Sequence, residues 1–368
     1  MKKALMCQFP YARGRAYVCK NIGDYVQTVA ARQYLDKIDL YIEQEEANNY
    51  YPEDKEPAKM IMNGWFQWRA ENFPPSEYIK PLLISLHISP LREKQLLTKA
   101  GIEFFLKNGP VGCRDYYTVN LLKSKNIPAY FSACLTLTLG KTYKVKKTDR
   151  KGYYFVDPYF EVPKQRNLFF VLKNIFYYMG HKNVIEKLAE KSFFRDYLPT
   201  GFIDRNRKKY RAYYKAIMFY KIYSKKFSKE LLLNASYITH WLDVDMKKQT
   251  NDDLINYAEN LISKYSAAKL VVTSRIHAGL PCLGMNTPVI FIANKEVVAE
   301  NGSFNTPGRL GGLIEFFRCL KLDNKVFSTD DNILNKIRKI DCNTYFSNKD
   351  DFKPYAIELE KKCTEFMK

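Results

Sequence analysis

The sequence predicts an α/β protein built on two open parallel sheets, with a helical insertion rich in basic and aromatic residues in its second half. Its 368 residues suggest two domains of roughly 150 residues each, and a 46% hydrophobic content is sufficient for a packed core in both. Short apolar runs alternate with helical stretches, a pattern typical of parallel βαβ units. We expect a first domain over residues 1–140, a second over 141–330 with the insertion at about 160–228, and C-terminal helices over 331–368.

The first domain opens with a strand, a glycine-containing turn and a helix. ALMCQF (4–9) is a short apolar strand, and YVQTVAARQYLDKI (25–38) has the apolar spacing of a helix. The same alternation predicts strands near 60–66 and 81–88 and helices over 93–108 and 116–126.

A second series of strands and helices begins at YYFV (153–156). It continues through KELLLNAS (229–236), a helix over 252–268, a strand over 269–274, a helix over 275–285 and a strand over 287–293. Inserted helices are expected between residues 163 and 228, and two more helices in the tail over 332–368.

The net charge of +20 is concentrated in one segment: between residues 141 and 230, Lys and Arg outnumber Asp and Glu by 23 to 8. RNRKKYRAYYKAIMFYKIYSKK (205–226) is expected to form a basic amphipathic helix, which suits an anionic membrane face. The alternative is a helix packed into the core of a chain biased towards Lys, Tyr, Asn and Ile. Nucleic acid is not expected as a partner, because no recognised nucleic-acid-binding module accompanies the charge.

The sequence predicts an intracellular protein with no membrane span. The apolar stretch at 168–180 is shorter than the roughly 20 residues needed to cross a bilayer and is interrupted by Lys173. The first residues lack the apolar segment and cleavage site of a signal peptide. The 8 cysteines and 4 histidines show no metal-binding spacing, so neither a metal nor another cofactor is expected.

The segment KLVVTSRIHAGLPCLGMNTPVIFI (269–292) carries the strongest functional signal. A strand ending at Ser274 delivers Arg275 and His277 into the first turn of a helix, where unpaired N–H groups favour an anion. The guanidinium of Arg275 suits a carboxylate or phosphate, and His277 can donate a hydrogen bond or a proton. The alternative is a surface charge beside a solvated histidine.

Two further turns follow predicted strands in the first domain. In NIGDYVQ, Gly23 permits close approach of a ligand, while Asp24 is either a general acid or base or the N-terminal cap of the helix. Asn63 and Gly64, after the strand near residue 60, are candidate backbone or loop contacts, with ordinary loop geometry as the alternative.

These segments resemble the polysaccharide pyruvyl transferase family. SRIHAGLPCLGMNTPVIFI resembles its Ser-Arg-x-His signature, and NIGDYVQTVAARQYL (21–35) resembles its amino-terminal Asn-x-Gly-Asp turn and helix. The stretch 109–139 resembles its central Arg-Asp helix and following strand, and NTPGRLGGLIEFF (305–317) resembles its late Arg-x-x-Gly-Leu segment. At 133–139, where many members carry Asp-Pro, this chain has Leu135-Thr136, so no carboxylate can act there.

The resemblance implies two Rossmann-like domains facing a cleft, as in glycosyltransferases of the B type. It also implies transfer of pyruvate from phosphoenolpyruvate onto two sugar hydroxyls as a ketal. Arg275 and His277 match the donor-binding pair, and Arg114 matches the Arg of the central Arg-Asp motif, with a surface ion pair to Asp115 as the alternative. His87 lies near a histidine that some members of the family carry, with a satisfied half-buried histidine as the alternative. His277 and Asp24 are the candidate catalytic groups, because a methylene carbon must gain a proton and a hydroxyl must lose one.

The expected partners are phosphoenolpyruvate as donor substrate, a sugar or lipid-linked oligosaccharide acceptor and an anionic membrane surface. The expected location is the cytoplasm, at the inner face of the membrane. Fold does not fix the reaction, so two alternatives remain: a glycosyltransferase of similar fold that uses a nucleotide sugar, and a catalytically silent membrane-associated interaction protein.

Overall fold

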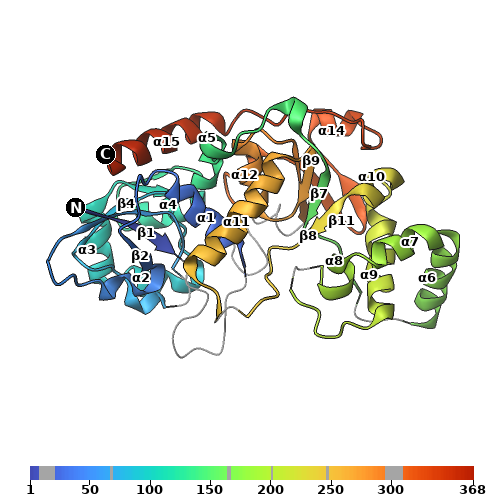
Figure 1. Cartoon of the computed structure of the whole chain (residues 1–368), viewed down its shortest axis with the longest axis horizontal. Helices are drawn as coiled ribbons and strands as arrows, with labels where there is room; N and C mark the ends of the chain where they lie inside the picture. The colour runs from blue at the N-terminus through green and yellow to red at the C-terminus, as the bar shows by residue number, and fades with distance from the viewer. Residues whose placement is uncertain (8–20, 67–68, 164–166, 200–201, 246–247, 295–309) are drawn as a thin grey trace.

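The chain is an α/β protein with parallel sheets and many helices, as the sequence predicts (Figure 1). The computed structural model describes residues 1–7, 21–66, 69–163, 167–199, 202–245, 248–294 and 310–368. None of the helices in these ranges has the length and hydropathy of a membrane-spanning segment. Of the glycine-containing turn expected over residues 11–24, residues 11–20 lie outside the described ranges.

Four parallel strands form the first sheet in the order β2-β1-β3-β4. Their bounds are β1 (Lys2–Cys7), β2 (Leu40–Glu43), β3 (Ala58–Met62) and β4 (Ile79–Leu83). Strands β5 (Val111–Cys113) and β6 (Ala129–Phe131) form a separate parallel pair. Leu86, just beyond β4, accepts from the N–H of Arg114 at 2.8 Å and donates to the carbonyl of Gly112 at 3.0 Å, so β5 lies beside the end of β4.

The second sheet has the order β12-β11-β10-β9-β7-β8 and is parallel except for the β11–β12 hairpin. Its strands are β7 (Tyr153–Val156), β8 (Ser236–Ile238), β9 (Leu270–Thr273), β10 (Val289–Asn294), β11 (Arg318–Asp323) and β12 (Val326–Ser328). The strand expected at 153–156 is therefore observed, whereas the hairpin at 318–328 was not predicted. The side chains of this hairpin alternate between more and less buried positions, because the hairpin lies at the edge of the sheet. Its sequence therefore has a weaker run of hydrophobic residues than the buried central strands.

Helices flank both sheets (Figure 1). In the first half they are α1 (Gly23–Arg32), α2 (Glu93–Leu96), α3 (Lys99–Asn108), α4 (Tyr116–Lys123) and α5 (Gly140–Tyr143). In the second half they are α6 (Leu168–Gly180), α7 (Lys182–Ala189), α8 (Ser192–Asp196), α9 (Lys209–Tyr223), α10 (Lys229–Asn234), α11 (Asn251–Ser266), α12 (Ile276–Gly284), α14 (Asn332–Lys336) and α15 (Lys353–Met367). Residues 229–234 are thus helical, and β8 starts only at residue 236.

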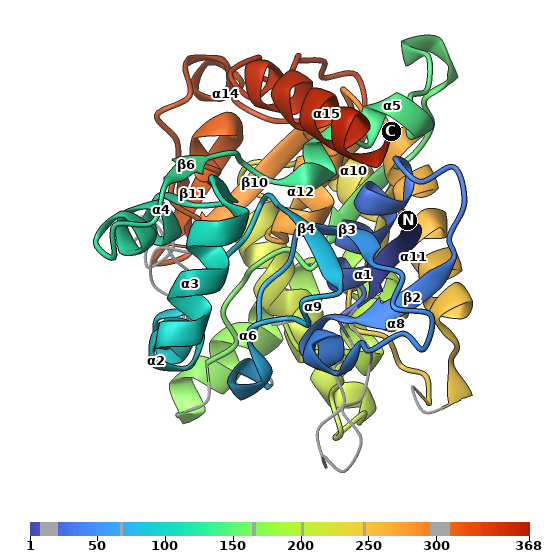
Figure 2. The same cartoon turned by 90° about the vertical axis from the view of Figure 1, so that its left-hand side faces the viewer.

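One buried apolar cluster contains residues of both sheets, and further clusters lie on the other face of each sheet. Val26 and Val29 of α1 belong to the same buried cluster as Leu254 of α11 and Leu280 of α12. Helix α15 runs beside α5 in both views (Figure 1, Figure 2), so the tail returns to the first half of the chain. Helix α1 therefore links the first sheet to the helices that cover the second.

Most of the basic stretch 205–226 forms a helix, α9, and most of its apolar residues are buried against α7 and α8, although Tyr210 is exposed. Even Lys215 is buried, with its Nζ 3.0 Å from Asp204 Oδ2 and 2.7 Å from the carbonyl of Tyr197. Of the two expectations for this stretch, the core-packed helix is the one observed. The helix is buried because its aromatic side chains Phe219 and Tyr223 pack against Phe155 of β7.

Candidate active site

Hydroxyl groups on two consecutive residues fix the carboxyl end of β9. Thr273 donates to a β7 carbonyl at 2.8 Å and accepts from the N–H of Arg275 at 2.9 Å. Ser274 donates to a β10 carbonyl at 2.8 Å and accepts from the N–H of Tyr159 at 2.9 Å. These bonds hold the turn in which β9 leads into α12, so Arg275 and His277 lie at the edge of the sheet.

A buried carboxylate orients Arg275. The Nε of Arg275 donates to Asp157 Oδ2 at 2.8 Å, and the same oxygen accepts from the backbone N–H of His240 at 2.9 Å. The side chain of Asp157 is 1% exposed, whereas that of Arg275 is 31% exposed. Because Asp157 accepts from its Nε, the guanidinium of Arg275 is held in one orientation while the side chain stays partly exposed.

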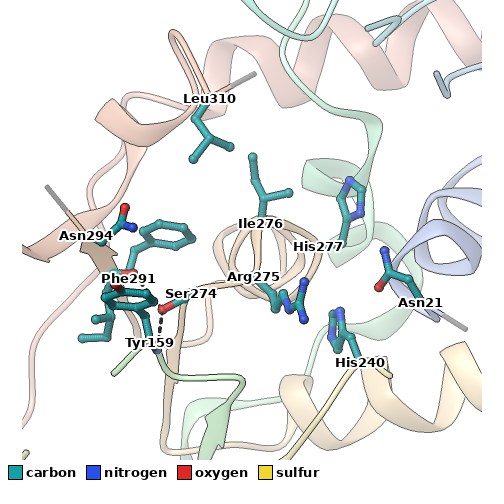
Figure 3. Close-up of a pocket in the computed structure, with 11 residues that line it drawn as sticks. Asn21, Tyr159, His240, Ser274, Arg275, Ile276, His277, Phe291, Asn294 and Leu310 are labelled. Carbon is teal, nitrogen blue, oxygen red and sulfur yellow. Dashed lines mark hydrogen bonds between the residues drawn. The ribbon is translucent and has the colours of Figure 1, made fainter. Parts of the chain in front are cut away.

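A cavity of about 180 Å³ opens at this point between residues of several elements. It is lined by Asn21, Tyr159, His240, Ser274, Arg275, Ile276, His277, Phe291, Ile292, Asn294 and Leu310. Arg275, His277, His240 and Asn21 lie on one side of the pocket in Figure 3, and Phe291, Tyr159 and Asn294 lie on the other. The pocket thus combines a cationic, hydrogen-bonding side with an aromatic side.

His240 contributes a neutral imidazole to this pocket. Burial lowers its pKa to about 4, since the attraction of Asp157 only partly opposes desolvation and Arg275 adds repulsion. Its Nε2 lies 2.9 Å from the hydroxyl of Tyr265. At neutral pH, His240 is therefore a hydrogen-bonding group and not a second cation.

The start of α1 closes the pocket from the side of the first sheet. Ile22 donates its N–H to the carbonyl of His240 at 2.9 Å, and the side chain of Asn21 accepts from the N–H of Gly23 at 3.2 Å. A Cβ on Gly23 would lie 3.1 Å from Nδ1 of His240 and 3.3 Å from Nδ1 of His277. Both imidazoles pack against the backbone of Gly23, so any side chain at this position would crowd them.

Asp24 lies in the first turn of α1 and is buried, with Oδ2 accepting from the side-chain amide of Asn21 at 3.4 Å. The helix begins at Gly23, and no side chain caps it from the preceding residue. It is Asn21 and not Asp24 that accepts a backbone N–H of this first turn, so the capping alternative for Asp24 has no support in this geometry.

A second polar cluster lies at the carboxyl ends of the first sheet. Arg114, which follows β5, is fully buried, and its Nη1 donates to Gln27 Oε1 on α1 at 3.3 Å. Its Nε and Nη2 have no hydrogen-bond partner within the described parts of the chain. The amide of Asn63 donates to the carbonyl of Gln27 at 2.9 Å. The cluster therefore combines a buried guanidinium with other strand-end polar groups.

The expected alternative for Arg114, a surface ion pair with Asp115, is wrong. Asp115 is itself buried and accepts from the N–H and the hydroxyl of Thr118, both at 2.9 Å, as the cap of α4. Its other oxygen lies 2.7 Å from Nδ1 of His87, whose backbone N–H donates to the carbonyl of Gly64 at 3.2 Å. The imidazole of His87 is thus fixed by a buried carboxylate.

The structure brings Ser274, Arg275 and His277 to one pocket, with Gly23 against its two imidazoles. Asp24, Asn63, Gly64, His87 and Arg114 are not among the lining residues described for that pocket, and the last four belong to the neighbouring cluster. The segment at 305–317 is only partly described, since residues 305–309 lie outside the described ranges.

Sequence reasoning missed Asp157 and His240. Asp157 directly follows the predicted strand 153–156, so its strand-end position was a usable signal. His240 comes two residues after β8, which the sequence did not delimit correctly. Asn21 is part of the NIGDYVQ motif, but no contact with a ligand was predicted for it.

A pocket with these cationic and hydrogen-bonding groups suits an anionic substrate. The pocket lies at the carboxyl ends of strands, where ligands of open α/β proteins bind. The family model of polysaccharide pyruvyl transferase matches residues 21–296, which include the second cluster and every lining residue of the pocket except Leu310. The chain therefore belongs to the polysaccharide pyruvyl transferase family and is a transferase. Comparisons with curated proteins and with solved structures gave no match.

Proposed function

We propose that this protein transfers pyruvate from phosphoenolpyruvate to a sugar of a surface-polysaccharide or glycan precursor, forming a cyclic ketal. The observation that carries the proposal is Arg275, which a buried Asp157 holds at 2.8 Å beside His277 in a partly enclosed pocket. A donor with a carboxylate and a phosphate needs several such oriented donors.

The anionic ends of the donor would be held from both sheets. Arg275 and the N–H groups at the start of α12 suit one anionic group. Arg114 is fully buried with two nitrogens that lack partners within the described residues, which is costly for a cation unless an anion arrives. We assign Arg114 to the other anionic group of the donor, with His87 as a hydrogen-bonding neighbour and Ser274, Asn63 and Gly64 as loop contacts.

The reaction requires three proton transfers, after which the proton taken up by Asp24 returns to His277 through solvent. His277 would protonate the methylene carbon, so that the adjacent carbon becomes electrophilic and a sugar hydroxyl bonds to it. Asp24, in the first turn of α1, would take the proton of that hydroxyl. Phosphate then leaves with its bonding electron pair, the second hydroxyl closes the ketal, and the second hydroxyl's proton ends on phosphate. Neither a metal nor a further cofactor takes part in this scheme.

The same proposal extends to architecture and location. The two parallel sheets, with the pocket beside α1, support two Rossmann-like domains arranged as in glycosyltransferases of the B type, with limits near residues 140 and 330 and the inserted helices at about 160–228. We place the enzyme in the cytoplasm at the inner face of the membrane, where a lipid-linked oligosaccharide would be its acceptor.

Ligand-dependent stabilisation tests the proposal against both alternatives. Thermal unfolding is followed with phosphoenolpyruvate, with a panel of nucleotide sugars and with neither. A ligand present at about 100 times its dissociation constant adds roughly 2.7 kcal/mol of stability, so only phosphoenolpyruvate should raise the unfolding temperature. Stabilisation by a nucleotide sugar alone would point to a glycosyltransferase, and stabilisation by none of them to a catalytically silent protein.

A further inference from the structure

Helix α6 presents an apolar face to solvent. Seven of its large apolar residues are exposed, with Leu168, Phe169 and Phe176 at 75%, 74% and 67% exposure. The others are Val171, Leu172, Ile175 and Met179. At 100° per residue these positions cover one broad side of the helix, whereas Asn174 on the opposite side is buried and Phe170 packs against α9.

The position of α6 leaves this face accessible. The helix lies at one end of the molecule, beside α7 and away from the first sheet at the other end (Figure 1). The apolar surface continues into a groove of about 640 Å³ between α6 and α9, lined by Phe170, Ile175, Tyr210 and Tyr214 among others. Large continuous apolar surfaces of this kind mark interaction sites on proteins.

Cations lie beside and behind the apolar face of α6. Lys173 is exposed on α6 itself, and Lys221 Nζ donates to Asn174 Oδ1 at 2.5 Å. Lys325 Nζ lies 6.0 Å from the ring of Phe170. Burial, and after it repulsion from Lys173 and Lys325, lowers the pKa of Lys221, so the three ammonium groups are close in space.

The wider insertion has the same sign of charge. Over residues 167–228, Lys and Arg outnumber Asp and Glu by 14 to 4, and two of the four acids, Asp196 and Asp204, form ion pairs with arginines or a lysine of the same segment. Helix α6 itself contains no acidic residue. An apolar face with cations beside and behind it complements a surface that is apolar inside and anionic outside.

We propose that α6 lies in the interface of an anionic lipid bilayer and anchors the protein there, with its apolar face among the acyl chains and the lysines beside and behind that face at the headgroups. A second copy of this chain is the weaker occupant, because self-association would bring two surfaces with the same excess of cations together. The inference does not rest on the proposed reaction, since it needs no substrate.

Vesicle flotation tests the inference with the full chain. Vesicles of phosphatidylcholine mixed with phosphatidylglycerol should carry the protein, vesicles of phosphatidylcholine alone should carry much less, and added salt should weaken the binding. The double variant Leu168→Ser/Phe176→Ser should reduce partitioning by at least about tenfold, because two side chains lose most of their transfer free energy. Lys173→Gln should reduce it by about fivefold, the equivalent of roughly 1 kcal/mol.

The matched control is Leu91→Ser/Ile357→Ser, at two residues of similar exposure, 72% and 69%, that lie on other elements. All variants change exposed side chains, and circular dichroism and phosphoenolpyruvate binding would report whether each is folded as the wild type is. The control should bind anionic vesicles like the wild type.

Three results would overturn the inference. The wild type could fail to float with anionic vesicles, or the two double variants could float equally well. The third is a dimer, seen by analytical ultracentrifugation without lipid, that the α6 variant alone dissociates while vesicle binding is absent. A failure of vesicle binding with phosphoenolpyruvate binding intact would leave the proposed function standing.

Discussion

Gly23→Ala adds one methyl group where the two halves of the site meet. The new Cβ would lie 3.1 Å from Nδ1 of His240 and 3.3 Å from Nδ1 of His277, closer than ordinary contact by a few tenths of an ångström. The ring of His240 is held by Tyr265 at 2.9 Å, so we expect part of the displacement to fall on His277. A misplacement of about 1 Å can cost about 100-fold in rate, so a shift of a few tenths should cost roughly 3- to 10-fold.

Stability should change little in the same variant. Alanine favours the helix over glycine by roughly 1 kcal/mol, which offsets the crowding of the two rings. We therefore expect an unchanged free energy of unfolding, measured in urea, together with slower pyruvyl transfer.

The control for this variant is Gly180→Ala at the end of α6, where a Cβ would meet no atom within 4 Å. Gly180→Ala changes helix propensity by a comparable amount, but its added methyl group makes no contact in the pocket. Calorimetric affinity for phosphoenolpyruvate and the rate of phosphate release are measured on both variants. If Gly23→Ala matches Gly180→Ala in both quantities, the rings do not contribute to the site as argued.

Three other predictions concern groups in the same pocket. Arg275→Lys keeps the charge but loses the planar fork and the bond to Asp157, so kcat/KM should fall by the equivalent of roughly 2–4 kcal/mol; wild-type turnover would refute the assignment. His277→Gln should retain affinity in calorimetry yet lower the saturated rate by roughly 100- to 10,000-fold; weak affinity with an intact rate would instead make Asp24 the leading acid. The buried His240 has a pKa of about 4, below the ordinary 6.5, so its neutral form contributes stability above pH 6.5 that is lost as the pH falls towards 4. Urea unfolding at pH 7.5 and 4.5 should show a loss larger by roughly 2–3 kcal/mol in the wild type than in His240→Gln, and equal losses would contradict the lowered pKa.

Local patterns made the centre of the site predictable. The strand, turn and helix around Arg275 and His277 have strong short-range periodicity, and the observed β9 and α12 differ from the expected bounds by only a residue or so. A strand-end position in a parallel sheet then predicts exposure to a ligand, whatever the rest of the chain does.

The partners of these residues could not be predicted from local patterns. Asp157 reaches Arg275 across 118 residues of sequence, and Gln27 reaches Arg114 across 87. Which polar groups meet depends on the order of strands in each sheet and on how α1 packs against α11 and α12, and neither follows from helical or strand periodicity.

The inserted helices show the same limit. Both α6 and α9 have apolar residues and lysines, but α9 is buried between other helices and α6 has an open apolar face. Composition identified the segment as unusual, and only the packing shows which of its helices faces solvent.

The most direct test of the central claim is the product itself. The protein is incubated with phosphoenolpyruvate labelled with ¹³C in its pyruvyl carbons and a panel of sugar acceptors, and carbon NMR is recorded while inorganic phosphate is measured. The account predicts a labelled ketal carbon on one class of sugar, formed together with one phosphate per ketal and strongly reduced in Arg275→Lys. Ketal formation at the wild-type rate in Arg275→Lys, or consumption of nucleotide sugar with no use of labelled donor, would contradict it.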